Sequence, residues 1–390
     1  MAHQFDHLIN RRNTHSYKWD QSAKLFGQDN ILPLWVADMD LPSPPAVRQA
    51  LEQRAAHGVY GYTITSEGYI DSIVQWLAAK HQWVIRPEWL SHSPGIVTSL
   101  SIAVELFSEP ESSVILQSPV YYPFYDVIRM NGRKPAINPL IVRNGRYEMD
   151  YEQLEQLMKD GAKLMLLCSP HNPGGRVWER QELERLCELC LRYGVTVVSD
   201  EIHADLTLPG HTHIPFASLS DESAAITLTC HAPTKTFNLP GLPSSFTVAS
   251  NADLRRKFEY RIKTLSLHMM NYFVPDAVEA AYREGGQWLE EVVQYVQANI
   301  NYAVQYLAEH LPELKPMTPQ AGYLLWLDCR AWNKSATEIK KLMYEDARVA
   351  FTEGSIFGAE GQGHLRINVA CPRVIVEQAL AQFAAAARSN

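Results

Sequence analysis

The 390-residue sequence lacks any apolar stretch close to the roughly 20 residues that a membrane-spanning helix requires. Its longest apolar runs, such as residues 195–199, have the length of a β-strand. The first 20 residues contain no apolar core of the kind that marks a secretory signal peptide, so we expect a cytoplasmic protein. Acidic residues outnumber basic ones, and the formal net charge of −8 gives no general attraction to nucleic acid or to anionic membranes. We expect neither as a partner.

Cysteine is also scarce. The chain has six cysteines, and so few in a chain of this length do not suggest a disulfide framework. Cys187 and Cys190 form a C-x-x-C pattern, but they lie in residues 180–194, which predict a helix, and we expect them to pack in its buried face. No second pair completes a zinc site. His211 and His213 lack an evident third ligand and are expected in a surface loop. We therefore predict no metal site.

Two common functional motifs are absent or out of place. No G-x-S-x-G sequence supports a serine hydrolase. The glycine-rich residues 358–363 do not join a strand to a following helix, so a dinucleotide-binding loop is not expected.

What the sequence does contain is an alternation of helical and strand patterns. Helices are predicted for residues 46–58, 95–107, 121–132, 180–194, 285–311 and 374–389, and strands for residues 31–40, 112–119, 163–170, 195–201, 224–230 and 321–329. Continuously apolar strands separated by helices indicate a parallel sheet covered on both faces. The fold class is therefore α/β, with a large, mainly parallel-sheet domain and a smaller α+β domain.

The chain is too long for one simple core, so two domains are the expected arrangement. We predict an N-terminal arm that forms part of the small domain (1–47), a large α/β domain (48–280) and a C-terminal small domain (281–390).

Polar residues follow three of the predicted strands, at the ends where open α/β sheets bind ligands. Asn172 follows the first of these strands, Asp200 and His203 follow the second, and Lys235 follows the third. Gaps of 28 and 35 residues fit one crossover unit each, or slightly more. We expect these side chains to meet in one crevice.

Such a set meets the needs of pyridoxal 5′-phosphate. A lysine amine forms the Schiff base and can carry a proton, and a carboxylate keeps the pyridine nitrogen protonated. Lys235 and Asp200 fit these two roles, and Asn172 fits as the partner of the ring oxygen. Backbone N–H groups at a helix start can bind the phosphate. The candidates for the phosphate and for stacking on the ring are Gly95, Ile96, Val97, Thr234 and Tyr121.

Each residue alone has an ordinary structural alternative. Lys235 can be a solvated surface lysine, Asn172 a turn residue, Asp200 a helix cap and Tyr121 a core aromatic. The functional interpretation rests on four motifs that occur in a fixed order at strand ends.

The order of SPHNPGG (169–175), SDEIH (199–203) and TKTFNLPGL (234–242) resembles the fold-type I pyridoxal-phosphate enzymes of the class I/II aminotransferase superfamily. Finer features resemble its MalY/PatB-type cystathionine β-lyase branch, which cleaves carbon–sulfur bonds. These features are NTHSYKWD (13–20), LWVADMDLPSP (34–44), GVYGY (58–62), SDEIHADL (199–206), APTKTFNLPGL (232–242) and HLRINVACPR (364–373).

The resemblance implies further roles. His203 stands where aminotransferases often have Tyr, and Tyr121 would stack on the ring. Arg366 would bind the substrate α-carboxylate, with Asp38 and Tyr62 also at the substrate. Tyr62 would reach the phosphate of the neighbouring subunit's cofactor, which implies a homodimer with sites at its interface.

Three positions depart from the family pattern, one of which is Glu353, where Pro is expected before the following Gly. Many aminotransferases have a phosphate-binding Arg where this chain has Pro243, which leaves open how the phosphate is held. Gly174 stands where Thr or Val is commoner.

The reaction implied is α,β-elimination. Lys235 removes the α-proton of L-cystathionine, cysteine or an S-substituted cysteine, and a thiol, pyruvate and ammonia result. Such a lyase would serve amino-acid metabolism, methionine biosynthesis in particular. The first alternative is an aminotransferase, which would share every cofactor residue. The second is a regulatory protein-interaction role on the same fold.

Overall fold

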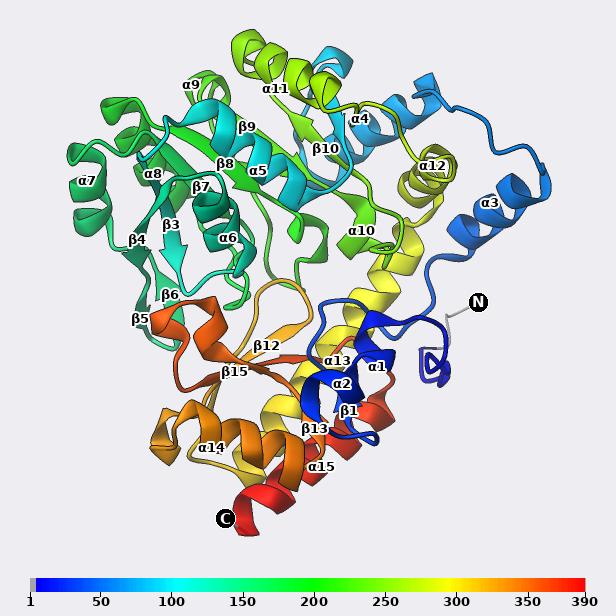
Figure 1. Ribbon diagram of the computed structural model, residues 1–390, viewed down its shortest axis with the longest axis vertical. Helices are drawn as coiled ribbons and strands as arrows, with labels where there is room; N and C mark the ends of the chain where they lie inside the picture. Colours follow the sequence, from blue (N-terminus) through cyan, green and yellow to red (C-terminus); the bar gives the residue numbers. More distant parts are fainter. Residues whose placement is uncertain (1–4, 390) are drawn as a thin grey trace.

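The computed structural model describes residues 5–389, which form a large sheet flanked by helices and a smaller sheet near the N-terminal helices and the C-terminal helix (Figure 1). The large sheet has seven strands in the order β2-β10-β9-β8-β7-β3-β4. In that order the strands are Leu90–Ser93, Ser245–Val248, Thr227–His231, Thr196–Asp200, Leu164–Cys168, Ser113–Ser118 and Lys134–Pro139. The five strands from β9 to β4 are parallel, while β10 pairs antiparallel with both β9 and β2. The prediction of a mainly parallel α/β sheet is confirmed.

Both faces of the large sheet are covered, which explains its unbroken apolar strands. Leu164 and Leu166 of β7 pack into one cluster and Met165 and Leu167 into another, because successive side chains point to opposite faces. The first cluster includes α5 (Ile96–Phe107), α6 (Pro123–Met130) and α11 (Ala252–Thr264). The second includes α7 (Tyr151–Lys159) and α8 (Arg180–Tyr193). Cys187 and Cys190 are buried in α8, as predicted.

The smaller sheet is antiparallel, in the order β11-β12-β15-β14. Its strands are Lys315–Met317, Leu324–Asp328, His364–Asn368 and Thr352–Glu353. A third cluster of buried residues joins this sheet to α4 (Glu67–His81), α12 (Val274–Glu284), α13 (Gly286–His310) and α15 (Arg373–Ser389). The remaining helices include α1 (Tyr17–Asp20), α2 (Ser22–Phe26), α3 (Pro45–Ala56), α9 (Asp221–Ala225), α10 (Pro233–Thr236) and α14 (Ala336–Lys341), and β5 (Ile141–Arg143) pairs with β6 (Arg146–Glu148).

The N-terminal segment packs on the C-terminal third. Strand β1 (Leu32–Pro33) pairs in parallel with β13 (Val349–Ala350). A strand was predicted for residues 31–40, but only Leu32–Pro33 forms one, so the prediction is wrong for the rest of the segment. The later residues are held differently, because Asn368 Nδ2 donates hydrogen bonds to the carbonyl oxygens of Val36 and Asp38, each at 2.6 Å. The domain boundaries at 47/48 and 280/281 stay predictions.

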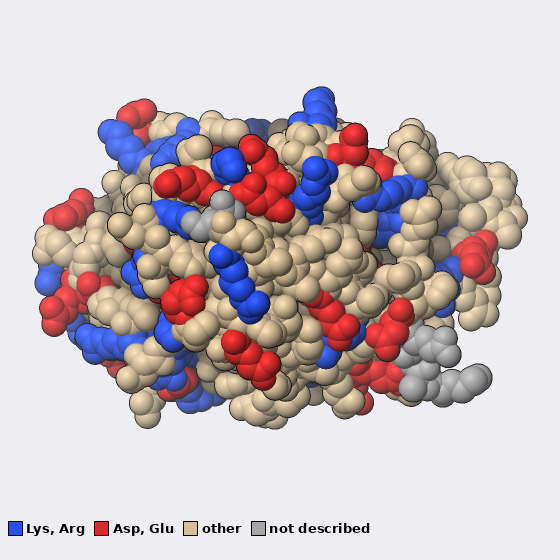
Figure 2. Space-filling model, turned by 90° about the horizontal axis from the view of Figure 1, so that it is seen from below, with Lys and Arg blue, Asp and Glu red and all other residues tan. Residues whose placement is uncertain are grey.

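The sequence predicts no membrane-spanning helix and, from its net charge of −8, no general attraction to nucleic acid or anionic membranes. Within residues 5–389, no helix is long and apolar enough to cross a membrane. The face seen in Figure 2 carries Lys and Arg intermixed with Asp and Glu, without a large area of one sign of charge.

The expectation that His213 lies in a surface loop is wrong. It is buried, and its Nε2 lies 2.8 Å from Glu201 Oε2, so the carboxylate satisfies the ring inside the protein.

Candidate active site

A cavity of about 410 Å³ lies at the carboxyl ends of β7, β8 and β9. The topology brings the predicted polar residues together there, because neighbouring parallel strands end at the same edge of the sheet. The predicted residues that line it are Gly95, Ile96, Val97, Tyr121, Asn172, Asp200, His203, Thr234 and Lys235. Tyr62, Arg366 and Asp38 do not line it.

Lys235 lies on α10, and its Nζ donates a hydrogen bond to the carbonyl oxygen of Ala37. Burial, with a contribution from Arg366, lowers the pKa of Lys235 to about 8, although Asp38 and Asp200 oppose the shift. About a tenth of the amine is therefore uncharged at pH 7, far more than for an ordinary lysine, and the uncharged form is the one that a nucleophile or a base requires.

Asp200 ends β8 and is 4% exposed. It accepts a hydrogen bond from the Ile202 N–H at 3.1 Å, and burial raises its pKa to about 7. Burial destabilises the ionised form of this carboxylate, and a positively charged N–H group beside it would stabilise that form. The cavity therefore has an acceptor suited to a protonated ring nitrogen.

Arg366 lies on β15 and contacts the lining residue Asn172, although it does not line the cavity itself. Its Nη1 donates to Asn172 Oδ1 at 3.1 Å and its Nη2 to the Trp35 carbonyl at 3.0 Å. Its Nε is buried without a hydrogen-bond partner in the described chain, and the guanidinium lies over the Phe357 ring at 4.8 Å. Burial lowers the pKa of Arg366 to about 10, and no carboxylate of residues 5–389 pairs with it. This buried cation is suited to binding an external carboxylate.

The start of α5, residues 95–98, also lines the cavity. The helix has Gly95 at its N-cap and no side-chain cap, so its first backbone N–H groups are available to an anion. Two hydroxyl residues that the sequence reasoning missed, Thr98 and Ser244, also line the cavity. Ser244 follows Pro243, the position where many aminotransferases carry Arg. Helix N–H groups and hydroxyls can therefore replace that guanidinium.

His203 and Tyr121 complete the lining. His203 Nδ1 is buried and has no hydrogen-bond partner among residues 5–389, and burial lowers the ring's pKa to about 3, so the imidazole is neutral. Burial raises the pKa of Tyr121 to about 12, so its hydroxyl stays protonated. The Tyr121 N–H donates to the Asn172 carbonyl at 3.0 Å, which fixes the tyrosine beside the asparagine.

Asp38 and Tyr62 lie elsewhere. Asp38 lines a second cavity of about 580 Å³, which shares Ala37 and Lys235 with the first. Its carboxylate is 2.7 Å from Arg11 and 3.5 Å from Lys18. Tyr62 is 94% exposed on its own chain. The substrate-binding roles of both residues remain predictions.

Comparisons with known proteins agree with this geometry. The family model for aminotransferase class I and II matches residues 29–383. The cystathionine beta-lyase PatB of Bacillus subtilis is 44% identical over 98% of this chain and 99% of its own length. The protein MalY of Escherichia coli is 32% identical over 99% of both chains. A crystal structure of a pyridoxal-phosphate-bound protein from Clostridium difficile 630, described as a candidate aminotransferase, superimposes with a TM-score of 0.97. It is 40% identical, over 98% of this chain and 99% of that one.

Proposed function

The chain belongs to the aminotransferase class I and II family, and we propose that within it the protein is a pyridoxal-phosphate-dependent carbon–sulfur β-lyase of the cystathionine β-lyase type. The reaction takes L-cystathionine, cysteine or an S-substituted cysteine with water and gives a thiol, pyruvate and ammonia. The observation that carries the proposal is the 44% identity to a cystathionine β-lyase over 98% of the chain.

The residues of the cavity fit pyridoxal phosphate. Lys235 offers a partly uncharged amine, Asp200 a buried acceptor for a ring N–H, and Asn172 and His203 polar groups beside them. The start of α5 offers backbone N–H groups for the phosphate. Bound there, the cofactor would supply a sink for the electron pair left on the substrate α-carbon.

Arg366 binds and orients the substrate in this proposal. Its guanidinium is already held by Asn172 and by the Trp35 carbonyl, so it loses little freedom when a carboxylate arrives. Its unpartnered Nε supplies a further donor for that carboxylate. The substrate α-carbon is thereby fixed between Arg366 and Lys235.

Lys235 moves the proton. With a pKa of about 8, its Nζ takes the proton from the substrate α-carbon, and the Ala37 carbonyl keeps the amine directed at the cavity. Loss of that proton lets the thiolate leave from the β-carbon. Hydrolysis of the remaining three-carbon fragment gives pyruvate and ammonia.

We also propose a homodimer in the cytoplasm, with Tyr62 of each subunit at the partner's phosphate. The extended segment around Tyr62 supports this, because its apolar side chains project from the protein without a covering element. Val59, Tyr60, Tyr62 and Ile64 are 65%, 62%, 94% and 81% exposed. Exposed apolar patches of this kind mark interfaces.

The experiment that tests the lyase is incubation of the purified holoenzyme with L-cystathionine and no keto acid. We expect pyruvate and a free thiol in equal amounts. The alternative is an aminotransferase, favoured by the description of the Clostridium difficile structure. Product that forms only when a keto acid is added would establish this alternative and contradict the lyase.

A further inference from the structure

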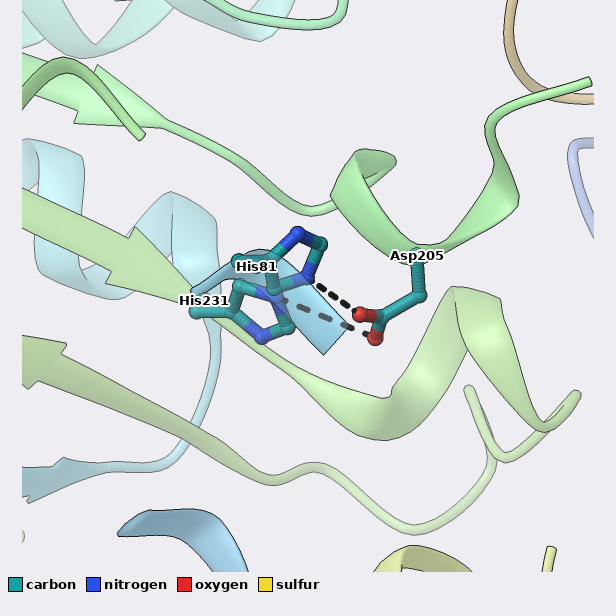
Figure 3. Close-up of side chains that lie close together, drawn as sticks. All are labelled: His81, Asp205 and His231. Atoms are coloured by element: carbon teal, nitrogen blue, oxygen red, sulfur yellow. Dashed lines mark hydrogen bonds and ion pairs between the residues drawn. The ribbon is translucent and has the colours of Figure 1, made fainter. Parts of the chain in front are cut away.

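A buried polar cluster lies outside the cavity, next to the backbone that carries the site. It consists of His81 at the end of α4, Asp205 after β8 and His231 at the end of β9. Figure 3 shows both imidazole rings directed at the carboxylate of Asp205. All three residues are buried, and none lines the cofactor cavity.

The Asp205 carboxylate is the centre of this cluster. Its Oδ1 accepts hydrogen bonds from His81 Nε2 at 2.7 Å and from Trp76 Nε1 at 2.9 Å. Its Oδ2 accepts one from Thr236 Oγ1 at 2.7 Å. Burial alone would raise the pKa of Asp205, but His231, His81 and the hydrogen bonds from His81 and Trp76 hold it below its ordinary value. The group is therefore a fully buried, ionised carboxylate with three donors.

The bond to Thr236 connects the cluster to the site. Thr236 directly follows Lys235 on α10, a helix of four residues with no side-chain cap at its start. So short a helix cannot hold its own orientation, because few of its backbone groups are paired within it. Asp205 itself lies two residues after His203. One carboxylate thus joins α4, the turn after β8 and the turn that carries the lysine.

We propose that Asp205 is a positioning residue that acts through Thr236 to fix α10 and so orients the Lys235 amine toward the cavity. This inference rests on the role of Lys235 in the proposed function. Asp205 touches neither the substrate nor the cofactor cavity, so its effect on the reaction passes through the orientation of the lysine.

A metal site is the other arrangement that these residues suggest. The three ligand atoms lie within 4.8 Å of one another, and neither ring nitrogen of His231 has a hydrogen-bond partner among residues 5–389. However, His81 Nε2 and Asp205 Oδ1 are only 2.7 Å apart. With zinc bonds of about 2.1 Å, that separation gives an angle of about 80°, far below the tetrahedral value. The hydrogen-bonded arrangement is the one that the geometry favours.

The test compares Thr236→Val, which keeps the shape but removes the hydroxyl donor, with Thr236→Ser, which keeps the donor. In the holoenzyme we expect Thr236→Val to lower kcat at least about tenfold, with KM within about twofold. We also expect it to shift the pH midpoint of the visible cofactor band by about half a unit or more. Thr236→Ser should retain the wild-type kcat and band position.

Asp205→Asn should also lower kcat and shift the pH midpoint of the band. The double variant Asp205→Asn with Thr236→Val should have the same kcat as Asp205→Asn alone, because both changes break the same interaction.

Glu353→Gln is the matched control, since Glu353 is another buried carboxylate but binds Ser355 in the smaller sheet. It should keep kcat and the band position even if Tm falls. If Thr236→Val lowers Tm but leaves kcat per bound cofactor and the band unchanged, Asp205 is only structural and the proposal is overturned. Stoichiometric zinc in the holoenzyme that is lost in His231→Ala would overturn it as well. A wild-type protein without a visible band would contradict the proposed function itself, which separates the two failures.

Discussion

Arg366 Nη1 lies 3.1 Å from Asn172 Oδ1, and this hydrogen bond joins the smaller sheet to the loop that follows β7 of the large one. The contact places a buried cation of one sheet beside the cavity of the other. Substrate binding by the proposed mechanism depends on this bridge, because Arg366 lies on β15 of the smaller sheet and Lys235 on α10, which follows β9 of the large sheet.

Arg366→Lys should weaken substrate binding without loss of the cofactor. A lysine keeps the charge but cannot bond Asn172, Trp35 and a carboxylate together. A charged hydrogen bond contributes about 1.5–3 kcal/mol, so kcat/KM should fall roughly 10–150-fold. Steady-state kinetics with L-cystathionine measures this, and the visible cofactor band serves as the control. Unchanged kcat/KM would remove Arg366 from the substrate site.

Lys235→Ala should abolish the visible absorption of the bound cofactor together with the lyase activity. The loss should exceed about 10³-fold, because one group acts as both anchor and base. Spectra of the variant incubated with excess pyridoxal phosphate test the first part, and pyruvate release tests the second. A retained band at the wild-type wavelength would mean that another lysine holds the cofactor.

Asp200→Asn should stabilise the cofactor-free protein at high pH. The raised pKa of about 7 means that the folded state holds more protons than the unfolded state between pH 4 and 7. The stability of the wild-type apo-protein therefore falls as pH rises through that window, and the cost is fully present above pH 7. The variant should have the higher Tm at pH 8, with the difference shrinking toward pH 4. Equal Tm differences at both pH values would show that the pKa of Asp200 is not raised.

Mixing two inactive variants should restore activity if Tyr62 serves the partner's site. In a heterodimer of Lys235→Ala and Tyr62→Ala subunits, one site has both changes and the other has neither. Random exchange of subunits should recover about a quarter of the wild-type activity, since half the dimers carry one intact site. Lys235→Ala mixed with itself is the control. No recovery despite proven subunit exchange would place Tyr62 outside the partner's active site.

The meeting of Asn172, Asp200 and Lys235 in one cavity could be predicted from sequence, because each lies in a short motif at the end of an apolar strand. Asn172, Asp200 and Lys235 meet simply because β7, β8 and β9 are parallel neighbours. The carbonyls of Ala37 and Trp35 could not be predicted, because backbone atoms leave no mark in the residue pattern.

Strand β10 was missed for a different reason. It pairs with β9 and with β2, which begins 155 residues earlier, so its place depends on contacts that no local pattern encodes. The burial of His213 depends in the same way on Glu201, whose position beside it arises only in the folded chain.

Strand β1 pairs with a strand that lies far from it in the sequence, β13, with Leu32 opposite Val349. Pairings of such sequence separation form late, because a long loop must close first. On the ribosome, the strands of the large sheet, which lie between residues 90 and 248, emerge well before β13 does. The backbone around Trp35 and Ala37 therefore cannot take up its contacts with both Arg366 and Lys235 until residue 366 has been synthesised. A nascent chain should consequently gain its catalytic competence only after β13 has been made and has paired with β1.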